Sequence, residues 1–270
     1  MKYLIVTNSF KDIGKNEANC LRDKILKRDT DSFVRVIFET ELDKIDKDSY
    51  SLVFGIGGDG TVLHLIHNFP ETPIFCFNKG RVGFLADGLM EEVDSIIDDI
   101  VLYHQYSISM NHFLRVKVDG ETYYCVNDVL VGKSMMPSTV ELSLFINDEF
   151  VKTFICDGIL VSSGLGSSAY NLSLGGPLIY GGMDALSLSV IGSKDLGFPK
   201  IVLPSHAEVK IRVNGRKKNV VSGLLGIDGT YITKDLYDGD KIEIDYGYQT
   251  FQLLRLSGYS YLNSIKSKIL

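Results

Sequence analysis

The first hundred residues alternate short apolar runs with segments in which apolar residues recur every three or four positions. Short runs are typical of buried strands, and the longer spacing is typical of amphipathic helices. Strands are predicted at residues 3–6, 34–38, 52–56 and 73–77, and helices at residues 15–28, from residue 61, and at residues 89–103. Strands separated by helices indicate a parallel sheet covered on both faces, so a doubly wound α/β domain is expected.

From about residue 105 the pattern changes to alternation of apolar and polar positions. Turn pairs interrupt it at Asp119-Gly120, Asn147-Asp148, Asp228-Gly229 and Asp238-Gly239. Alternation with such turns predicts antiparallel strands, with one helix candidate at residues 167–174. We therefore expect an α/β domain over residues 1–104, a β-rich antiparallel domain over residues 105–249, and a C-terminal segment, residues 250–270, that packs back on the first domain.

A glycine-rich run, Gly57-Gly58-Asp59-Gly60-Thr61, stands between the third predicted strand and the following helix. Glycine suits a turn whose backbone takes a positive φ or approaches a ligand closely, and a helix N-terminus attracts anions. This combination predicts a phosphate site. A carboxylate beside phosphates repels them unless it binds a metal ion or acts as a base, so Asp59 indicates chemistry as well as binding.

Three more polar segments follow in order along the chain. Asn78 comes directly after the strand predicted at residues 73–77, next to the strand that carries Asp59. Asn127-Asp128 interrupts an apolar run, and buried polar groups of this kind need partners. Residues 157–170 combine a strand, a loop of small residues and the start of a helix, which favours a second backbone cradle.

Composition narrows the class of protein. The chain has 270 residues, is 45% hydrophobic and carries a net charge of −6, with its lysines and arginines scattered, so no nucleic-acid partner is expected. No segment is long enough to span a membrane, and no membrane partner is expected. The four cysteines form no C-x-x-C pair, so each is expected to fill an apolar slot in a reducing cytoplasm; they are Cys20, Cys76, Cys125 and Cys156.

The glycine run also admits other interpretations. Its Gly55-x-Gly57-x-x-Gly60 spacing fits a Rossmann dinucleotide fingerprint. However, the next strand ends in Asn78 and not in the acid that holds a ribose in that fold. His64 and His67 lie one helical turn apart, but two histidines without a third ligand indicate packing or surface positions more than a metal site. No protein metal ligand is predicted.

The order of these motifs resembles that of the NAD kinase family. The resemblance runs from the first strand to about residue 245, and its most specific part is the stretch from Asp157-Gly158 to Gly166-Ser167-Ser168-Ala169-Tyr170 and Gly175-Gly176-Pro177. The GGDGT run alone names only a superfamily, because diacylglycerol-type lipid kinases share it. The resemblance implies transfer of a phosphoryl group from ATP, or from polyphosphate, to the 2′-hydroxyl of the adenosine ribose of NAD.

The resemblance also implies roles for particular residues. Asp59 would act as general base or orient the ribose hydroxyl, with Mg²⁺ or another divalent cation at the donor phosphates. The donor phosphates would be held by Gly57, Gly58, Gly60 and Thr61. NAD would be bound by Gly60, Asn78, Phe84, Asn127, Asp128, Ser168, Ala169 and Tyr170, and at its nicotinamide end by Asp157 and Ser173. In the family these last two often come from a neighbouring subunit, so a homodimer or homotetramer is expected.

The chain departs from the family in the central loop, where Ser163-Gly164-Leu165 replaces the usual Thr-Pro-Thr, and at Ile155, near which a basic residue often lies. The segment around Gly192 also lacks the usual histidine and Arg-Pro pair. Two alternatives remain: a lipid kinase of the related fold, and a non-catalytic dinucleotide sensor. The lipid kinase would not explain the motifs after residue 126, and the retained Asp59 argues against the sensor.

Overall fold

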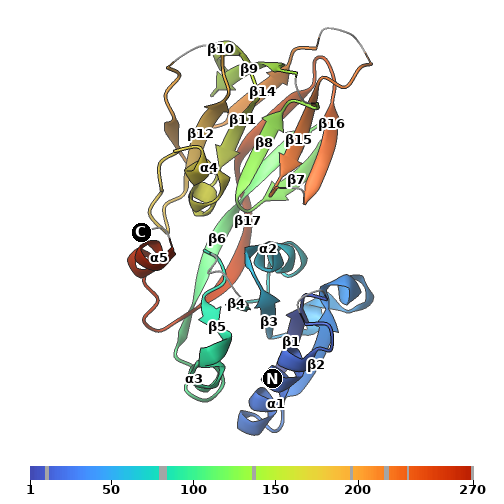
Figure 1. Ribbon diagram of the computed structural model, residues 1–270, viewed down its shortest axis with the longest axis vertical. Coiled ribbons are helices and arrows are strands. Elements are labelled where there is room, and N and C mark those ends of the chain that lie inside the picture. The colour runs from blue at the N-terminus through green and yellow to red at the C-terminus, as the bar shows by residue number, and fades with distance from the viewer. Residues whose placement is uncertain are drawn as a thin grey trace. The chain divides into compact units, whose positions relative to one another are not determined.

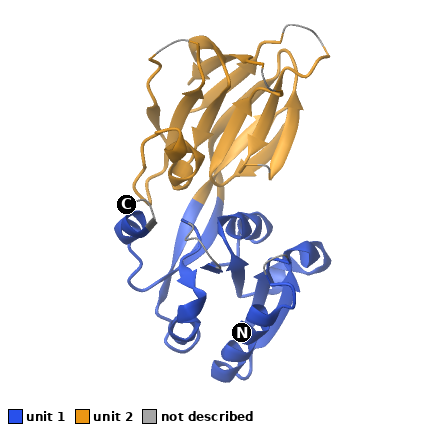
Figure 2. Cartoon of the chain, viewed as in Figure 1, with its two compact units in different colours: residues 1–111, 250–270 blue, residues 112–249 orange. Residues whose placement is uncertain are grey.

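The structure, a computed structural model, describes residues 1–9, 12–78, 84–135, 138–194, 197–215, 219–229 and 231–268. The chain divides into two units, which Figure 2 colours separately. Unit 1 comprises Met1–Asn111 and Thr250–Leu270, and unit 2 comprises His112–Gln249. The chain passes between the units in two long strands, β6 (Tyr106–Val118) and β17 (Lys241–Leu256).

The sheet of unit 1 is parallel, as predicted. β1 lies between β2 and β3, and β4 follows β3. The last part of β17 joins in parallel beside β4, where Leu253 pairs with Ile74. Because β1 leads to β2 on one side and β3 leads to β4 on the other, the strand order reverses between β1 and β3. The strands are β1 (Lys2–Thr7), β2 (Phe33–Phe38), β3 (Leu52–Gly57), β4 (Ile74–Asn78) and the short β5 (Gly88–Leu89).

Helices cover both faces of this sheet. Leu21 of α1 (Asn16–Arg28) and Ile96 of α3 (Val93–Ile97) share a buried cluster with Phe54 of β3. The next residue, Gly55, faces the other way, and a Cβ added there would lie 2.7 Å from Leu65 of α2 (Asp59–Asn68). The doubly wound prediction is therefore confirmed, and Figure 1 shows α2 following β3 directly. Other helical segments of unit 1 are the 3₁₀ turns η1 (Glu39–Lys44) and η2 (Lys47–Ser49) and the C-terminal helix α5 (Tyr261–Lys268).

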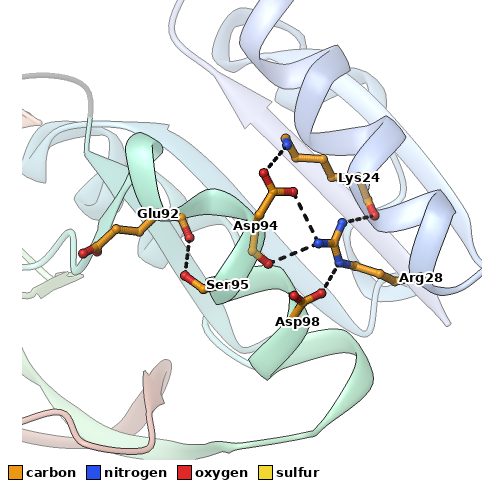
Figure 3. Close-up of polar contacts among 6 residues, drawn as sticks. All are labelled: Lys24, Arg28, Glu92, Asp94, Ser95 and Asp98. Carbon is orange, nitrogen blue, oxygen red and sulfur yellow. Dashed lines mark hydrogen bonds and ion pairs between the residues drawn. The ribbon is translucent and has the colours of Figure 1, made fainter.

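Polar contacts join α1 to α3 and to Asp98, the residue directly after α3, on their shared face of the sheet (Figure 3). Lys24 Nζ lies 2.6 Å from a carboxylate oxygen of Asp94. Arg28 donates from Nε to Asp98 and reaches Asp94 at 3.3 Å. These pairs fix how the ends of the two helices meet above the apolar cluster.

The prediction of one regular helix over residues 89–103 is wrong, because this segment is irregular. Leu89 pairs with Asn78 as part of β5, and the helical part starts with a 3₁₀ turn, η3 (Met90–Glu92), and ends in a π-helical turn, η4 (Asp98–Leu102). The apolar residues Ile96, Ile97 and Ile100 are nevertheless buried. Periodicity therefore predicted the buried face, but strand pairing at Leu89 and the changes of helical pitch could not be read from it.

Unit 2 contains two antiparallel sheets. One has the order β13-β12-β11-β8-β15-β16, and in the other β10, β9, β14 and the first part of β17 follow one another, with β6 pairing both β17 and β7. The strands are β7 (Glu121–Cys125), β8 (Asp128–Gly132), β9 (Val140–Ile146), β10 (Glu149–Cys156), β11 (Gly158–Ser162), β12 (Ala185–Ile191), β13 (Ile201–Pro204), β14 (Val209–Val213), β15 (Gly223–Ile227) and β16 (Ile232–Leu236).

Alternating residues of both sheets form one buried core in unit 2, which confirms the period-2 prediction. Val209 and Ile211 of β14 share this core with Ile159 of β11. At the turn Asp119-Gly120 both residues have positive φ, 52° and 78°, the geometry that tight hairpins require. The helix candidate at residues 167–174 appears as two short segments, η5 (Leu165–Ser168) and α4 (Tyr170–Ser173).

Two further expectations concern cysteines and membranes. Cys76, Cys125 and Cys156 are buried, but Cys20 is exposed, so the expectation of an apolar slot is wrong for Cys20. Within the ranges that the structure describes, no helix is both long and apolar enough to cross a membrane.

Candidate active site

The glycine-rich turn lies at the carboxyl end of β3. β3 ends at Gly57 and α2 begins at Asp59, two residues before the start predicted at residue 61. Between them Gly58 is extended, with φ −107° and ψ −167°. The strand order of the sheet reverses between β1 and β3, and the turn directly follows β3. Open α/β sheets bind ligands at such positions. The first turn of α2 directs its backbone N–H groups toward the same place.

The glycines of this turn are required by space and not by backbone conformation. None of them has a positive φ, so that part of the sequence argument is wrong here. A Cβ on Gly57 would lie 2.1 Å from Thr61 Oγ1, whereas no described atom lies within 4 Å of a Cβ on Gly58 or Gly60. Gly57 thus makes room for the buried Thr61, and Gly58 and Gly60 leave open space in which a ligand can approach the backbone.

The carboxylate of Asp59 is held by backbone amides. Phe84 donates its N–H to Oδ2 at 2.7 Å, and Leu85 and Ala86 donate to Oδ1 at 2.9 and 3.2 Å. Two carboxylate oxygens together offer about four lone-pair positions. Asp59 is therefore fixed in orientation by three donors and retains capacity for a further hydroxyl donor.

Asn78 and Phe84 lie in the same part of unit 1. Asn78 is the last residue of β4, is buried, and pairs in register with Gly57. Sequence reasoning placed it on the strand beside the Asp59 strand, and this placement is confirmed. The ring of Phe84 meets that of Tyr261 edge to face, with centroids 6.3 Å apart. Gly80 and Gly83, which follow Asn78 in the sequence, lie outside the described residues.

In unit 2, the Asn127-Asp128 pair stands at the start of β8, and an acid from a distant turn supports it. The carboxylate of Asp228 accepts the N–H groups of Val126 and Asn127 at 2.9 and 2.6 Å. In return the N–H of Asp228 donates to the carbonyl of Asp128 at 3.0 Å. This exchange fixes the backbone that presents Asn127 and Asp128.

The loop of small residues packs directly on this pair. Ser163 donates its N–H to the carbonyl of Asn127 at 2.8 Å. A Cβ on Gly166 would lie 2.0 Å from the same carbonyl oxygen, so glycine alone fits there. The N–H of Tyr170 bonds the carboxyl of Asp128. The structure therefore brings Asn127 and Asp128 together with the loop that continues through Ser168, Ala169 and Tyr170.

Tyr246 fastens the same loop to β17. Its hydroxyl accepts the N–H of Gly164 at 3.0 Å and donates to the carbonyl of Ala185 at 3.0 Å. Proline, which the family usually has at the position of Gly164, lacks an N–H and could not make this bond. The loop of this chain is thus held by a hydrogen bond that its own departure from the family pattern permits.

Among the described acids of unit 2, Asp128 is the one whose pKa is raised. It is only 6% exposed, and burial, reinforced by the nearby charge of Asp228, raises its pKa from 3.8 to about 7, although the N–H of Tyr170 acts in the opposite direction. Near neutral pH its carboxyl group can therefore both donate and accept hydrogen bonds.

Asp157 lies at the other end of the same strands. Gly158 pairs with Gly132, and Ser162 pairs with Asp128; four residue steps separate these pairs, or about 13 Å at about 3.3 Å per residue. Ser173 follows Asn171, whose amide oxygen accepts a hydrogen bond from Ser187, the strand partner of Ser162. The structure therefore does not bring Asp157 and Ser173 of one chain together.

A lysine accompanies Asp157. Lys133 Nζ lies 2.7 Å from Asp157 Oδ1, and the N–H of Lys133 donates to the carbonyl of Asp157. Gly192 closes the other side, since a Cβ there would lie 2.7 Å from the carboxylate. A cation thus stands at this site directly after a neighbouring strand, β8, although the chain has Ile155 and Cys156 before the Asp-Gly pair.

Sequence reasoning missed the residues that support the site in unit 2. Asp228 was predicted only as part of a turn, and its buried carboxylate had no sequence signal beyond the Asp-Gly pair. Asn171 is fully buried and bonds the carbonyls of Ser167 and Pro177, both at 3.0 Å. A polar residue within a glycine-rich loop was the available signal for Asn171, and Tyr246 had none.

Within the described ranges, no group of three or more histidine, cysteine or acidic side chains is arranged to hold a metal ion. The acid at the glycine turn is Asp59, and a cation there would need oxygen ligands from a bound phosphate as well. This donor set fits Mg²⁺, which proteins usually bind through one or two carboxylates together with substrate phosphates and water.

Comparison with known proteins identifies the family. The model of the ATP-NAD kinase N-terminal domain matches residues 4–106, and that of the ATP-NAD kinase C-terminal domain matches residues 126–256. An NAD kinase of Clostridium botulinum (strain Loch Maree) is 28% identical over 269 residues, which cover 97% of this chain and 94% of that protein. An NAD kinase of Christiangramia forsetii is 29% identical, over 83% of this chain and 76% of its own.

Solved structures share the fold. An NAD kinase from Archaeoglobus fulgidus, in complex with ATP, has a TM-score of 0.77 at 21% identity and covers 99% of this chain and 98% of its own. The yeast NADH kinase, complexed with NADH, has a TM-score of 0.82 at 18% identity and covers 98% of this chain and 86% of its own. With both domain models matched in order over most of its length, the chain belongs to the NAD kinase family and is a phosphotransferase.

Proposed function

We propose that this NAD kinase transfers the γ-phosphoryl group of ATP to the 2′-hydroxyl of the adenosine ribose of NAD, with the carboxylate of Asp59 as its general base. The observation that carries the proposal is the placement of Asp59. Its carboxylate stands at the carboxyl end of β3, is oriented by three backbone amides, and lies at the N-terminus of α2. The three hydrogen bonds that hold the carboxylate of Asp59 do not by themselves require glycine at the positions on either side of it.

Asp59 would act on the ribose hydroxyl. A secondary hydroxyl is a poor nucleophile, and in phosphoryl transfer positioning and charge stabilisation supply most of the rate. The carboxylate would accept the hydroxyl proton in a hydrogen bond and direct the oxygen lone pair at the γ-phosphorus. It would take up the proton as the new P–O bond forms and the bond from the γ-phosphorus to the bridging oxygen breaks, which releases ADP. Leu85 and Ala86, which hold Oδ1, would keep the carboxylate turned toward that hydroxyl.

The glycine turn would hold the donor. Gly58 and Gly60 leave the backbone open to phosphate oxygens, and the N-terminus of α2 favours negative charge. Gly57 and Thr61 would complete the turn. Mg²⁺, brought to the site with ATP, would neutralise charge on the transferring phosphoryl group.

NAD would be recognised mainly by unit 2. Asn127 and Asp128 present amide and carboxyl groups, and Ser168, Ala169 and Tyr170 adjoin them, a combination suited to an adenine and its ribose. The family resemblance also assigns Gly60, Asn78 and Phe84 of unit 1 to NAD binding. The solved yeast relative binds NADH, which is consistent with a dinucleotide in these positions.

A second copy of the chain would complete the nicotinamide end. The family resemblance assigns both Asp157 and Ser173 to that end. In one chain, however, Asp157 directly precedes β11, whereas Ser173 follows Asn171, which bonds Ser187 beside the other end of β11. If both contact one NAD molecule, they come from two copies, which supports a homodimer or homotetramer. The buried cysteines, all free where described, fit a reducing compartment, and we propose a cytoplasmic location.

The test is a direct assay. The protein is incubated with ATP, Mg²⁺ and NAD, and NADP is measured; polyphosphate replaces ATP in a parallel reaction. Asp59→Asn should lower kcat by about 10²-fold or more while NAD still binds, because general-base and positioning effects contribute about 10²–10⁴-fold. Asp23→Asn, at an exposed acid of unit 1, is the control and should leave turnover unchanged.

Each alternative gives its own result. NAD binding by the unmodified protein without any NADP would indicate the dinucleotide sensor. Phosphorylation of diacylglycerol with no binding of NAD would indicate the lipid kinase. Full activity of Asp59→Asn would remove the proposed role of this carboxylate, even if NADP is made.

A further inference from the structure

The loop that holds Asp59 is itself held by an ion pair. Residues 84–86 donate the three N–H groups to the Asp59 carboxylate. The next residue, Asp87, forms a salt bridge through its carboxylate with Arg255 on β17. The chain of contacts therefore runs from Arg255 to Asp87, through the backbone of three residues, to Asp59.

This ion pair is buried and its arginine is confined. The side chains of Asp87 and Arg255 are only 12% and 8% exposed. The guanidinium also lies over the ring of Tyr259, with 4.5 Å between Cζ and the ring centroid. A buried charge that loses its partner is strongly unfavourable, so this pair can hold a backbone segment in one position.

Both partners are attached to the sheet that carries the glycine turn. Leu253, two residues before Arg255, pairs with Ile74 of β4. Gly88, directly after Asp87, pairs with Phe77 of β4, and a Cβ on Gly88 would lie 2.7 Å from the ring of Phe75. Strand pairing therefore fixes the loop at Gly88, and the salt bridge with Arg255 fixes it at Asp87.

We propose that Arg255 and Asp87 are positioning residues for the phosphoryl transfer, acting through the amides of residues 84–86 on the carboxylate of Asp59. This rests on the proposed role of Asp59. Without the guanidinium, the carboxylate of Asp87 would turn toward water, and the backbone before it would lose its fixed direction. Asp59 would remain present but no longer directed at the ribose hydroxyl, and a displacement of about 1 Å in such a group can cost about 10²-fold in rate.

Kinetics of matched variants test the proposal. Arg255→Met keeps most of the side-chain length and removes the charge; it should lower kcat about 10- to 100-fold, with KM for NAD and for ATP changed less than about threefold. Arg255→Lys should recover part of the loss, because the charge returns without the planar fork. In the Asp59→Asn background, Arg255→Met should cause no further loss.

The control is Arg115→Met. This variant removes a different Arg-Asp ion pair, which Arg115 forms with Asp245 on another part of β17, and it should leave kcat unchanged.

Backbone amide hydrogen exchange gives a readout that does not depend on turnover. In Arg255→Met, and in Asp87→Asn if the first variant does not fold, the peptide covering residues 84–88 should exchange at least tenfold faster, while peptides of unit 2 stay unchanged. Equal exchange in that peptide would overturn the proposed restraint. Faster exchange with unchanged kcat, or additive losses with Asp59→Asn, would overturn the positioning role. If the unmodified protein makes no NADP, the proposed function fails, and the exchange experiment still reports whether the ion pair holds the loop.

Discussion

The carboxyl group of Asp128 combines burial with a neighbouring acid. Desolvation, together with the charge of Asp228, raises its pKa to about 7, while Asp228 itself receives several hydrogen-bond donors. The two acids are therefore unequal: Asp228 serves the backbone of the site, and Asp128 can change protonation near neutral pH.

This pKa predicts how stability depends on pH. Because the pKa of Asp128 is raised on folding, its neutral form is favoured in the folded state; that contribution is fully present below about pH 3.8 and is lost as pH rises to about 7. Asp128→Asn, which stays neutral, should therefore gain stability over the unmodified protein between about pH 5 and pH 8, by as much as a few kcal/mol. Urea unfolding of the variant and of the unmodified protein at pH 5 and at pH 8 measures this difference in the free energy of unfolding. Asp235→Asn, at an exposed acid of the same unit, should show no such trend, and an equal response of both variants would contradict the prediction.

Single residues of the site were predictable where a motif specified them, and their partners were not. Asp59 stood out because an acid is unusual between glycines. Its three donors come from residues 84–86, and no property of their side chains indicates that their N–H groups bind a carboxylate. The same holds for Asp228, whose Asp-Gly pair is typical of any hairpin turn.

At the level of helices and strands, apolar periodicity predicted which faces are buried. The helix over residues 15–28 and the strands of unit 1 are confirmed to within about two residues. The segment at residues 89–103 was harder, because its apolar residues are buried as a helix would bury them while Leu89 pairs with β4. Local pattern does not report pairing with a distant strand, so the irregular start of this segment followed only from the structure.

The contact between α1 and α3 gives a second prediction. Arg28 is 15% exposed and pairs with Asp98 and Asp94 on the other segment, so Arg28→Met should lower Tm by about 2–4 °C at low salt. The difference should shrink in 1 M NaCl, because salt screens partly exposed charges. Arg22→Met is the matched control on the same helix, since Arg22 pairs only with its neighbour Asp23 among the described salt bridges. The prediction fails if both variants melt alike, or if the Arg28→Met difference is independent of salt.

At the scale of the whole chain, the change in the spacing of apolar residues near residue 105 separated an α/β region from a β-rich region. The order of four motifs indicated the family. The parallel sheet of unit 1 and the antiparallel sheets of unit 2 are confirmed. What the sequence could not show is the distance between motif residues once the strands pair. Asp157 and Tyr170 are close in sequence, yet β11 carries the chain from one end of the sheet to the other between them.

This separation predicts complementation between copies of the chain. If Asp157 serves the NAD bound by a neighbouring copy, an Asp59→Asn chain still supplies Asp157, and an Asp157→Ala chain still supplies Asp59. Each variant alone should be nearly inactive or impaired, but after the two are unfolded and refolded together, intact sites should form. In a two-chain assembly with random pairing, about a quarter of the sites would then hold both acids.

NADP formation by the mixture, compared with that of each variant refolded alone, measures the effect. A mixture of Asp59→Asn with Asp59→Ala is the control, because no pairing of those chains restores the acid. If the Asp59→Asn and Asp157→Ala mixture gains nothing while light scattering shows mixed oligomers, Asp157 acts within its own chain or not at all, and the two-copy site is wrong.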